Sequence, residues 1–400
     1  MKISIIGPSY PFRGGLSLHT TLLCRYLRKG HDVSFYSFKR QYPAWLFPGK
    51  TDRDNSTEPV REPDVEHLLD SLNPWTWLKV ARRIADDRPD LVIIPWWTFF
   101  WAPQFLTIAL LLRLLSKSRL LFICHNVFDH DSRRLSRFCA KSVLPRGDFF
   151  IVHSNDDFAR LSTFVDPGRI TLGFLTSNES AADMAPLQED AKRGLGLSGD
   201  VLLFFGFVRP YKGVRHLLDA LPLILREREI TLLLVGESWA GDDSVQPRIR
   251  ELGIEKCVRR VDGYVPNEEV SRYFAAADLV VLPYVSATGS GVVQTAFTFE
   301  RPVVATRVGS LPLTIDDGHT GYLVEPGNPA AIADAVLRFF REGKGPEFIE
   351  NIKQAKKQFS WERFVELIEE AATRREEVWT TKVGADDPRA VTEPRKQRGC

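Results

Sequence analysis

Continuous apolar runs of strand length alternate with helical segments along the first part of the chain. The runs at residues 2–6, 32–36, 91–94 and 120–124 do not alternate between apolar and polar positions. Such runs are typical of strands in a parallel sheet that is covered on both faces, and the helical segments between them fit the connections of βαβ units. The pattern predicts an α/β domain whose last strand covers residues 149–153.

The pattern stops near the middle of the chain and then starts again. Residues 176–200 are polar and irregular. The second series comprises strands at 201–205, 231–235, 258–262, 279–283 and 303–306 and helices at 217–225, 270–277 and 329–341. Because 400 residues exceed the usual size of one hydrophobic core, we expect two doubly wound domains.

These observations give domain bounds. The boundaries that we expect are 1–176 for an N-terminal domain, 177–360 for a C-terminal domain, 361–381 for a helix returning to the N-terminal domain, and 382–400 for a disordered polar tail. Within the first domain, residues 42–63 form a loop long enough to be functional and to fold over an acceptor.

Composition and charge exclude some classes of protein. With 44% apolar residues, both domains can be well packed. The 53 Lys and Arg residues nearly balance the 51 Asp and Glu residues, so net charge gives no argument for a nucleic-acid partner. The five cysteines are scattered and lack metal-binding spacing, which favours a reducing cytoplasm. The apolar start is too short for a signal peptide, and Pro103 and Arg113 interrupt the longest apolar run, so we expect no transmembrane segment.

Two cations lie where a strand gives way to a helix. Residues 205–213 read FGFVRPYKG and place Arg209 and Lys212 at this junction. Ligands of open α/β sheets bind beyond the carboxyl ends of the strands, where helix N-termini favour anions. The pair therefore suits a diphosphate, and the alternative is a solvated loop.

A second anion signal follows at Thr288, Gly289, Ser290 and Gly291. These residues precede the apolar helical run at 292–299. Gly and Ser at the start of a helix leave N–H donors for a ligand. An N-cap explains Ser290 alone but not both glycines, so we favour an anion clamp that these residues form with Arg209 and Lys212.

The first domain offers weaker signals at two strand ends. Gly14 and Gly15 follow the first strand and allow close approach of backbone or ligand, although a tight turn explains them equally well. They lack the G-x-G-x-x-G spacing of a dinucleotide site. His125, beside Asn126, ends the strand at 120–124 and could hold a sugar hydroxyl, against a purely structural role; for His19 we favour the structural role.

Three further patterns admit alternatives. Asp129 and Asp131 suit a divalent cation, but turns also select aspartate. The aromatic run at residues 96–101 fits buried core better than sugar stacking. The last pattern is a helix with Trp75, Trp77, Lys79, Arg82 and Arg83, which could touch an anionic bilayer, although an ordinary surface helix is the simpler interpretation.

Taken in their order along the chain, the sequence motifs resemble those of the family-four retaining glycosyltransferases over nearly the whole chain. The resemblance rests on GPSYPFRGGLSLH from residue 7, ICHN at 123–126, FGFVRPYKG, and ADLVVLPY from residue 277 followed by ERPVVATRVGS and DDGHTGYLVEPG. The last block is the most specific. The resemblance implies the GT-B fold, two facing Rossmann-like doubly wound parallel-sheet domains, with the donor bound mainly by the C-terminal domain and the acceptor by the N-terminal one.

The resemblance also implies roles for individual residues. It puts Gly15 near the donor phosphate or reacting sugar, the stretch 263–265 near the base, and backbone donors of 289–291 on the phosphates, without a metal. The catalytic residues that we expect are Arg209 and Lys212 on the diphosphate and His125 on the sugar. The donor-binding residues that we expect are Gly14, Gly15, Gly263, Tyr264, Thr288, Gly289, Ser290, Gly291 and Thr295.

The chain departs from the family pattern in two places. Relatives often have two glutamates with seven residues between them that contact the donor sugar and the ribose, but Ala287 and Thr295 occupy those positions here. Glu300 lies past the helix and does not substitute for them. The usual Gly-Arg also reads Gly206-Phe207, and we expect Arg209 to supply the missing charge.

The sequence thus predicts a retaining glycosyltransferase without cofactor or metal. It would move a sugar from a UDP-, GDP- or ADP-sugar to a hydroxyl of a glycan or lipid-linked acceptor, in polysaccharide, glycan or glycolipid biosynthesis. We expect a cytoplasmic protein, with peripheral contact at the cytoplasmic membrane face as an option. The alternatives are a non-catalytic nucleotide-sugar-binding or assembly protein, a GT-B sugar-nucleotide epimerase, and a metal-dependent transferase that uses Asp129 and Asp131.

Overall fold

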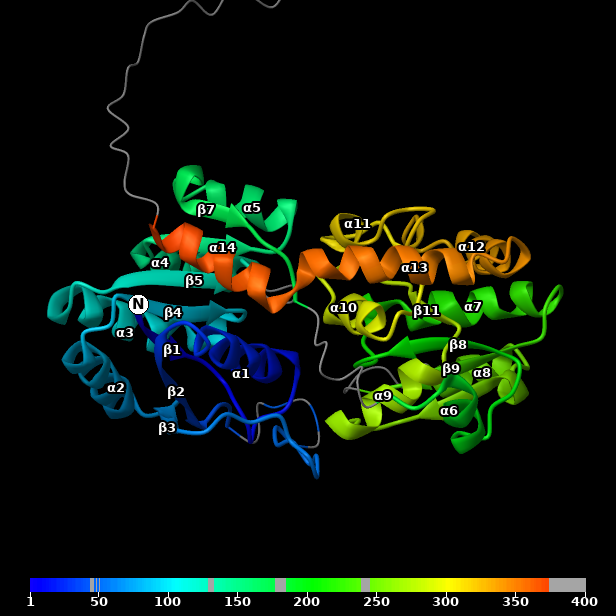
Figure 1. Cartoon of the computed structure of the whole chain (residues 1–400), viewed down its shortest axis with the longest axis horizontal. Helices are drawn as coiled ribbons and strands as arrows, with labels where there is room; N and C mark the ends of the chain where they lie inside the picture. The colour runs from blue at the N-terminus through cyan, green and yellow to red at the C-terminus, as the bar shows by residue number, and fades with distance from the viewer. Residues whose placement is uncertain are drawn as a thin grey trace, which may run out of the picture.

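Two α/β lobes lie side by side along the long axis of the molecule (Figure 1). This computed structural model describes residues 1–43, 47, 49, 51–128, 133–176, 185–238 and 245–373. Each lobe contains one sheet, and the strand pairs in both sheets are parallel. The prediction of two doubly wound parallel-sheet domains is therefore confirmed.

The N-terminal sheet has seven strands in the order β3-β2-β1-β4-β5-β6-β7. The strands are β1 (Lys2–Ile6), β2 (Asp32–Arg40), β3 (Val65–Asp70), β4 (Leu91–Trp96), β5 (Arg119–Cys124), β6 (Phe149–Val152) and β7 (Ile170–Leu172). The expectation that residues 149–153 form the last strand is wrong, because β7 follows. Both β3 and β7 escaped prediction since they lie at the sheet edges, where a strand can be short or carry charged residues.

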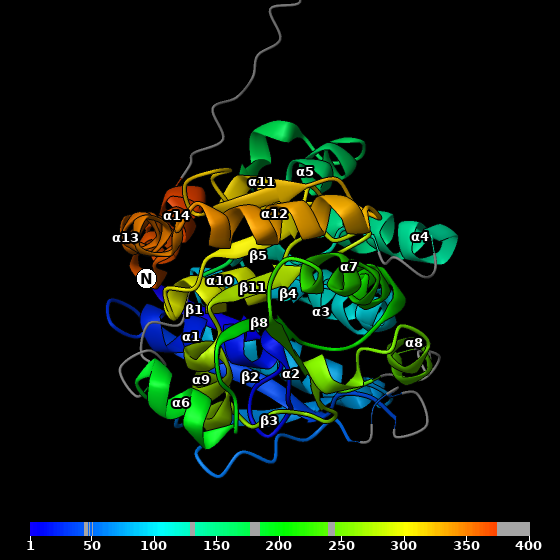
Figure 2. The same ribbon diagram turned by 90° about the vertical axis from the view of Figure 1, so that its right-hand side faces the viewer.

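Helices cover both faces of this sheet. They are α1 (Gly15–Leu27), α2 (Pro74–Asp87), α3 (Ala102–Leu115), α4 (Arg133–Val143) and α5 (Asn155–Ser162). On one face, α2, α3 and α4 pack over a core that includes Trp77, Phe105 and Val143. The other face is covered by α1 and by α14 (Trp361–Thr373), which comes from the far end of the chain (Figure 2).

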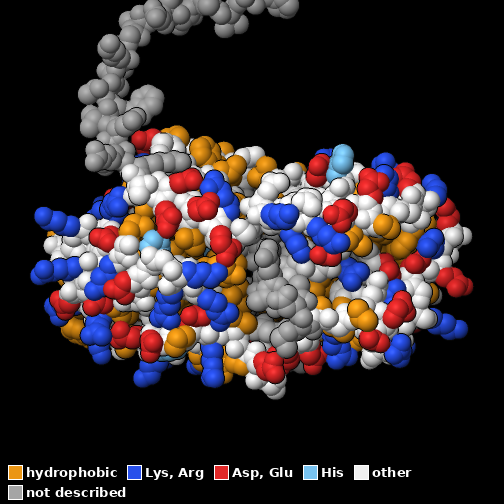
Figure 3. Space-filling view, in the orientation of Figure 1, with side chains coloured by type: hydrophobic (Ala, Val, Ile, Leu, Met, Phe, Trp, Pro, Cys, Tyr) orange, Lys and Arg blue, Asp and Glu red, His pale blue; other side chains and the backbone are white. Residues whose placement is uncertain are grey.

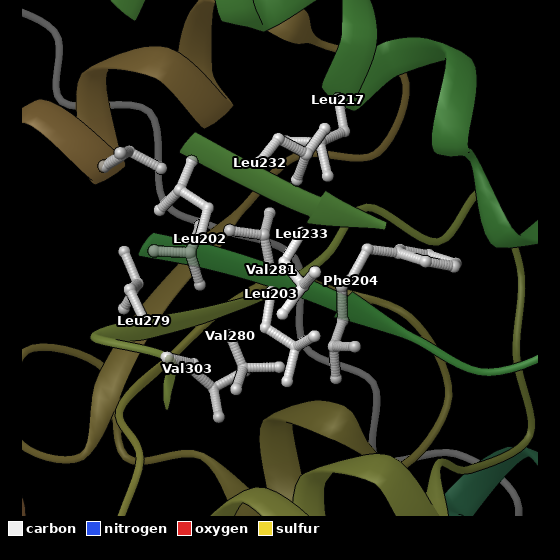
Figure 4. Packing of buried hydrophobic residues seen from close by; sticks show 14 of the residues in the cluster. Leu202, Leu203, Phe204, Leu217, Leu232, Leu233, Leu279, Val280, Val281 and Val303 are labelled. Carbon is white, nitrogen blue, oxygen red and sulfur yellow. The ribbon is translucent and has the colours of Figure 1, made fainter. Parts of the chain in front are cut away.

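The C-terminal sheet has six strands in the order β10-β9-β8-β11-β12-β13. The strands are β8 (Asp200–Phe205), β9 (Ile230–Val235), β10 (Val258–Val261), β11 (Leu279–Leu282), β12 (Val303–Thr306) and β13 (Gly321–Val324). The short edge strand β13 was also missed. In the central strands β8, β9 and β11, side chains such as Leu202, Leu233 and Val280 are buried and pack together (Figure 4).

The helices of this lobe complete the two layers. They are α6 (Gln188–Gly194), α7 (Val214–Leu225), α8 (Val245–Glu251), α9 (Asn267–Ala276), α10 (Gly291–Thr298), α11 (Leu311–Thr314), α12 (Pro329–Arg341) and α13 (Gly345–Ala355). After α13, the chain crosses back to the N-terminal lobe (Figure 1). There Trp361, Phe364 and Ile368 of α14 are buried against Ile5 and Ile93. The last described helix therefore ties the two lobes together.

Candidate functional site

A pocket of about 550 Å³ opens between the two lobes. Its lining combines loops that follow β1, β8, β9 and β10 with part of α9 and α10. Five of the predicted donor-binding residues line it, namely Gly14, Gly15, Gly263, Tyr264 and Thr295. Because the carboxyl ends of both sheets contribute to one pocket, it occupies the place where doubly wound sheets bind their ligands.

The glycines of the first loop leave room in this pocket. Gly14 has a φ of 106°, which L side chains rarely adopt, and a Cβ on Gly14 or Gly15 would have no neighbouring atom within 4 Å. The two glycines therefore do not serve close packing against the protein. Their backbone is instead open to an occupant of the pocket.

The predicted cations lie next to the pocket but outside its lining. Arg209 precedes a short 3₁₀ turn after β8, η5 (Pro210–Lys212), and Lys212 ends it, while Gly206 and Phe207 of the same loop do line the pocket. The Lys212 Nζ lies 3.8 Å from the centroid of the Tyr284 ring, whose hydroxyl is bonded to Ser290 at the start of α10. The Tyr284 ring therefore links Lys212 to the start of α10.

Gly213 fixes the direction in which the chain leaves this turn. Its φ of 66° is left-handed, and a Cβ there would overlap the carbonyl oxygen of Pro283. Only glycine fits this backbone position. The Lys-Gly pair in the sequence therefore reflects a close approach between the loops after β8 and β11.

The start of α10 supplies the third part of the anion clamp. Ser290 occupies the N-cap position, but its side chain caps no backbone N–H and instead shares a 3.1 Å hydrogen bond with the Tyr284 hydroxyl. The N–H groups of the first turn keep their capacity to bind an anion. The predicted residues at this end, Thr288, Gly289, Ser290 and Gly291, lie outside the lining of the pocket.

The positions of the absent glutamates differ in environment. Thr295 lines the pocket, and its hydroxyl donates a 3.0 Å hydrogen bond to the Gly291 carbonyl within α10. Ala287 packs against the C-terminal core. Glu300 forms an ion pair of 3.1 Å with Lys356 and does not line the pocket.

His125 belongs to a cluster of three histidines in the N-terminal lobe, and none of the three lines the pocket. Its ring centroid lies 4.8 Å from that of His19 and 5.1 Å from that of His153. Its backbone N–H donates to the Trp96 carbonyl at 2.8 Å, while its Nε2 is buried. The side chain of Asn126 next to it accepts a hydrogen bond from the Thr288 hydroxyl of the other lobe.

Burial keeps these histidines neutral. It lowers the pKa of His19 to about 3, with a further contribution from His153, and the pKa of His153 to about 4. The pKa of His125 is also well below its usual value because of burial and the two neighbouring histidines. In the described part of the chain, no three His, Cys, Asp or Glu side chains are grouped as metal ligands. His125 therefore offers a neutral hydrogen-bonding group.

Sequence reasoning missed an ion pair between the lobes. Arg13 and Glu237 approach to 2.5 Å, and their side chains are 3% and 5% exposed. The Arg13 guanidinium also lies 4.9 Å from the centroid of the Tyr264 ring in the C-terminal lobe. The sequence feature that could have indicated this ion pair is the position of both residues, which follow strands whose carboxyl ends face the cleft.

The loop predicted at residues 42–63 reaches the C-terminal lobe. The backbone N–H and the hydroxyl of Thr57 both donate to Glu268 Oε1 at 2.8 Å. Asn267 donates to Ser56 Oγ at 2.9 Å and to Asp54 Oδ2 at 3.2 Å. Since Asp54 and Glu268 line the pocket, this part of the loop closes one side of it.

Asp129, His130 and Asp131 lie outside the described residues, so the alternative of a metal-dependent transferase stays a prediction.

Comparisons with known families and proteins agree on one family. The family model "Glycosyltransferase Family 4" matches residues 13–172, and the model "Glycosyl transferases group 1" matches residues 199–342. The chain is also similar to D-inositol 3-phosphate glycosyltransferases. It is 29% identical to that of Corynebacterium urealyticum over 62% of this chain and 63% of the relative, and 27% identical to that of Corynebacterium glutamicum over 58% and 59%. The match thus spans about three fifths of these relatives.

Solved structures show the same fold. The Anabaena protein Alr3699/HepE in complex with UDP-glucose superposes with a TM-score of 0.73 at 17% identity, covering 92% of this chain and 99% of that protein. At this level of identity the likeness concerns the fold. The expected GT-B arrangement of two facing parallel-sheet domains is confirmed.

Proposed function

The chain belongs to the family-four glycosyltransferases of the GT-B fold, and from this premise we propose that it transfers a sugar from a nucleotide-sugar to an acceptor hydroxyl with retention of configuration. The observation that carries the proposal is the pocket between the lobes, whose lining includes Gly206 and Phe207 from the loop that carries Arg209 and Lys212, and Thr295 from α10. A nucleotide can occupy such a pocket while its diphosphate meets the cations.

The donor would lie with its base beside the stretch 263–265. This loop and the backbone of Gly14 and Gly15 line the pocket, and Tyr264 offers an aromatic face. The diphosphate would extend toward the Lys212 ammonium and the uncapped N–H groups of α10. Structures of this fold with bound UDP and UDP-glucose support a nucleotide-sugar as the class of donor.

The transfer step follows from this placement. The bond between the sugar C1 and the leaving phosphate oxygen breaks while the acceptor oxygen bonds to C1 on the same face. The acceptor proton passes to the departing phosphate oxygen. Arg209, Lys212 and the N-terminus of α10 would stabilise the negative charge that grows on the diphosphate, and such donors each contribute about 3 to 4 kcal/mol in related cases.

The neutral state of His125 suits a sugar contact. A protonated imidazole would repel the positive charge that develops at C1, whereas a neutral ring can donate or accept one hydrogen bond to a hydroxyl. Its low pKa keeps it neutral across physiological pH. We place His125 on the donor sugar, on the N-terminal side of the transferred group.

The acceptor is proposed only by chemical class. The hydroxyl would belong to a glycan or a lipid-linked glycan and would enter from the N-terminal lobe. The relatives named above act on D-inositol 3-phosphate according to their names, and a phosphorylated polyol is therefore a second class worth assaying.

The test is donor binding and turnover with a panel of UDP-, GDP- and ADP-sugars, for wild type and Lys212→Ala in parallel. We expect one nucleotide-sugar to bind selectively, and Lys212→Ala to lower kcat/KM by about 10²- to 10³-fold without loss of thermal stability. Arg215→Ala is the matched control, because Arg215 is an exposed cation on the adjacent α7.

Two results would contradict the proposal. Full kcat/KM in a folded Lys212→Ala protein would remove the anion clamp. Selective donor binding without transfer to any acceptor would instead favour a non-catalytic nucleotide-sugar-binding protein, which the absence of glutamates at Ala287 and Thr295 keeps as the second candidate.

A further inference from the structure

The outer side of the α2–α4 layer exposes large apolar side chains. Trp75 at the start of α2 is 78% exposed, Leu114 near the end of α3 is 81% exposed, and Phe138 on α4 is 70% exposed. The same helices carry further exposed apolar side chains, namely Leu110, Leu115 and Leu135, and Leu72 is exposed just before α2. Scattered apolar residues are normal on a surface, but a layer of three adjacent helices that carries six of them is a candidate interaction face.

The other apolar side chains of these helices lie on the side that faces the sheet. Trp77, predicted together with Trp75 as a candidate bilayer contact, is 9% exposed and packs in the core. Phe105 and Val143 are fully buried. The exposed residues are therefore not a continuation of the core, because the sheet side of each helix already has its own set.

Basic residues outnumber acidic ones on the same layer. Neither α3 nor α4 contains an acidic residue, and α2 carries Asp86 and Asp87 beside its three cations. The exposed cations on the three helices are Lys79, Arg82 and Arg83 on α2, Arg113 on α3, and Arg134, Arg137 and Lys141 on α4. Within the described residues, Arg83 and Arg113 form ion pairs with Glu66 and Asp148, but none joins Arg134, Arg137 or Lys141 to an acidic side chain.

A shallow hollow on α2 combines both properties. It has a volume of about 330 Å³ and is lined by Trp75, Leu78, Lys79, Arg82, Arg83 and Asp86. An indole next to cationic side chains is the combination found where proteins contact the headgroup region of a bilayer. The hollow is too open for a buried ligand and suits the edge of a broad surface contact.

The opposite side of the molecule differs. The face in Figure 3, which carries α1, α13 and α14, shows Lys and Arg side chains interspersed with Asp and Glu. On α14, Arg363 is paired with Glu366 and Glu370. Mixed charges of this kind give no net attraction for an anionic surface.

We propose that the outer side of the α2–α4 layer is a docking surface for an anionic lipid bilayer. It would bind peripherally, since none of the described helices has the length and apolar composition to cross a membrane. The cations would meet anionic headgroups while Trp75, Leu114 and Phe138 enter the interface between headgroups and acyl chains. This inference goes beyond the proposed function and does not depend on it.

The charge pattern favours a bilayer over a protein partner. A protein interface generally has charged residues at its rim and few at its centre, whereas here cations and apolar side chains alternate along the same helices. Alternation of this kind suits a surface in which anionic and apolar parts lie a few ångströms apart in depth.

The test is flotation of the full-length protein with vesicles of phosphatidylcholine alone or with about 30% of the anionic lipid phosphatidylglycerol. We expect binding to the anionic vesicles and little to the neutral ones, with a loss at high salt. Arg134→Glu/Arg137→Glu/Lys141→Glu should weaken binding at least about tenfold, and Leu114→Ser/Phe138→Ser by roughly the same factor.

Matched controls lie on the other lobe. Arg226→Glu/Lys256→Glu/Arg259→Glu reverses three exposed cations there, and Leu187→Ser removes an apolar side chain that is 77% exposed. Both control variants should bind vesicles as wild type does, and all variants should keep donor affinity for a soluble nucleotide-sugar. A failure of vesicle binding with intact donor binding would overturn this inference alone.

Three results would overturn the docking surface. The first is wild-type protein that floats with neither vesicle, and the second is a charge-reversed α4 variant that floats as wild type does. The third is light scattering that shows a dimeric wild type and a monomeric Leu114→Ser/Phe138→Ser variant, because the face would then be an interface between two copies of this chain.

Discussion

The two lobes share one architecture but present different chemistry to the cleft. The carboxyl end of the C-terminal sheet offers Arg209, Lys212 and the uncapped start of α10, which together favour a negatively charged group. The N-terminal lobe has the open backbone at Gly14 and Gly15 in the pocket and, close to the carboxyl ends of its strands, three histidines whose low pKa values keep them neutral: His19 and His153 are buried and His125 is half-buried. One side of the cleft is thus suited to a diphosphate and the other to uncharged hydroxyl groups.

This difference indicates how a transferase can work without paired carboxylates. In the proposed reaction, the negative leaving group would develop on the C-terminal side, and the positively polarised sugar carbon would lie between the lobes. Cations on one side and neutral groups on the other would stabilise the leaving group without repelling the sugar carbon. This division of roles requires the two lobes to keep their relative orientation. The contacts that join the lobes therefore matter for the site.

The largest effect is expected from the ion pair that joins the lobes. Glu237→Gln would leave the Arg13 guanidinium buried without its charged partner and should lower the free energy of unfolding by about 3 to 5 kcal/mol. Denaturant unfolding measures this change. Small-angle X-ray scattering should also show a larger radius of gyration, since the lobes lose a buried contact.

The double variant Arg13→Met/Glu237→Leu separates the two contributions. Because two apolar side chains replace both charges, most of the lost stability should return. A loss below about 1 kcal/mol in Glu237→Gln would mean that the pair is solvated in solution and that the lobes are held by α14 and the loop at residues 51–60 instead.

The outline of both lobes could be predicted from the sequence because buried parallel strands are continuous apolar runs. The edge strands β3, β7 and β13 were missed: β3 contains Glu66, His67 and Asp70 in six residues, β7 has only three residues, and β13 begins with Gly321. The same limit applies to the site. Gly15, Tyr264 and Thr295 follow local motifs, whereas the Arg13–Glu237 pair joins residues 224 positions apart, and no periodic pattern encodes such a contact.

The histidine cluster provides a test of the N-terminal side alone. A histidine that is neutral when folded but has an ordinary pKa of 6.5 when unfolded contributes stability that is present above pH 6.5 and is lost as the pH falls. Between pH 8 and pH 5 the expected loss is about 2 kcal/mol for each such residue. His19→Phe should therefore reduce the pH-dependent loss of unfolding free energy by about 2 kcal/mol.

The measurement is denaturant unfolding at both pH values for wild type and variant. Asp157 acts in the opposite direction, because burial raises its pKa to about 6, but it is present in both proteins and cancels in the difference. His319→Phe serves as the control, since the His319 side chain is 64% exposed in the other lobe. Equal pH dependence in wild type and His19→Phe would show that the cluster is hydrated and that the N-terminal side is not held neutral by burial.

The smallest effect is expected at Thr295, on the C-terminal side, where the family resemblance leads us to expect a glutamate. The Thr295 hydroxyl donates to the Gly291 carbonyl, so its lone pairs remain to accept a hydrogen bond from a donor hydroxyl in the pocket. Thr295→Val keeps the shape and should raise the dissociation constant of the donor about fivefold, or about 1 kcal/mol, in calorimetry. Thr373→Val is the matched control, because its hydroxyl also bonds the carbonyl four residues earlier, but on α14. Unchanged donor affinity in Thr295→Val would mean that the C-terminal side holds the donor through its cations and backbone alone, which would make the contrast between the lobes sharper still.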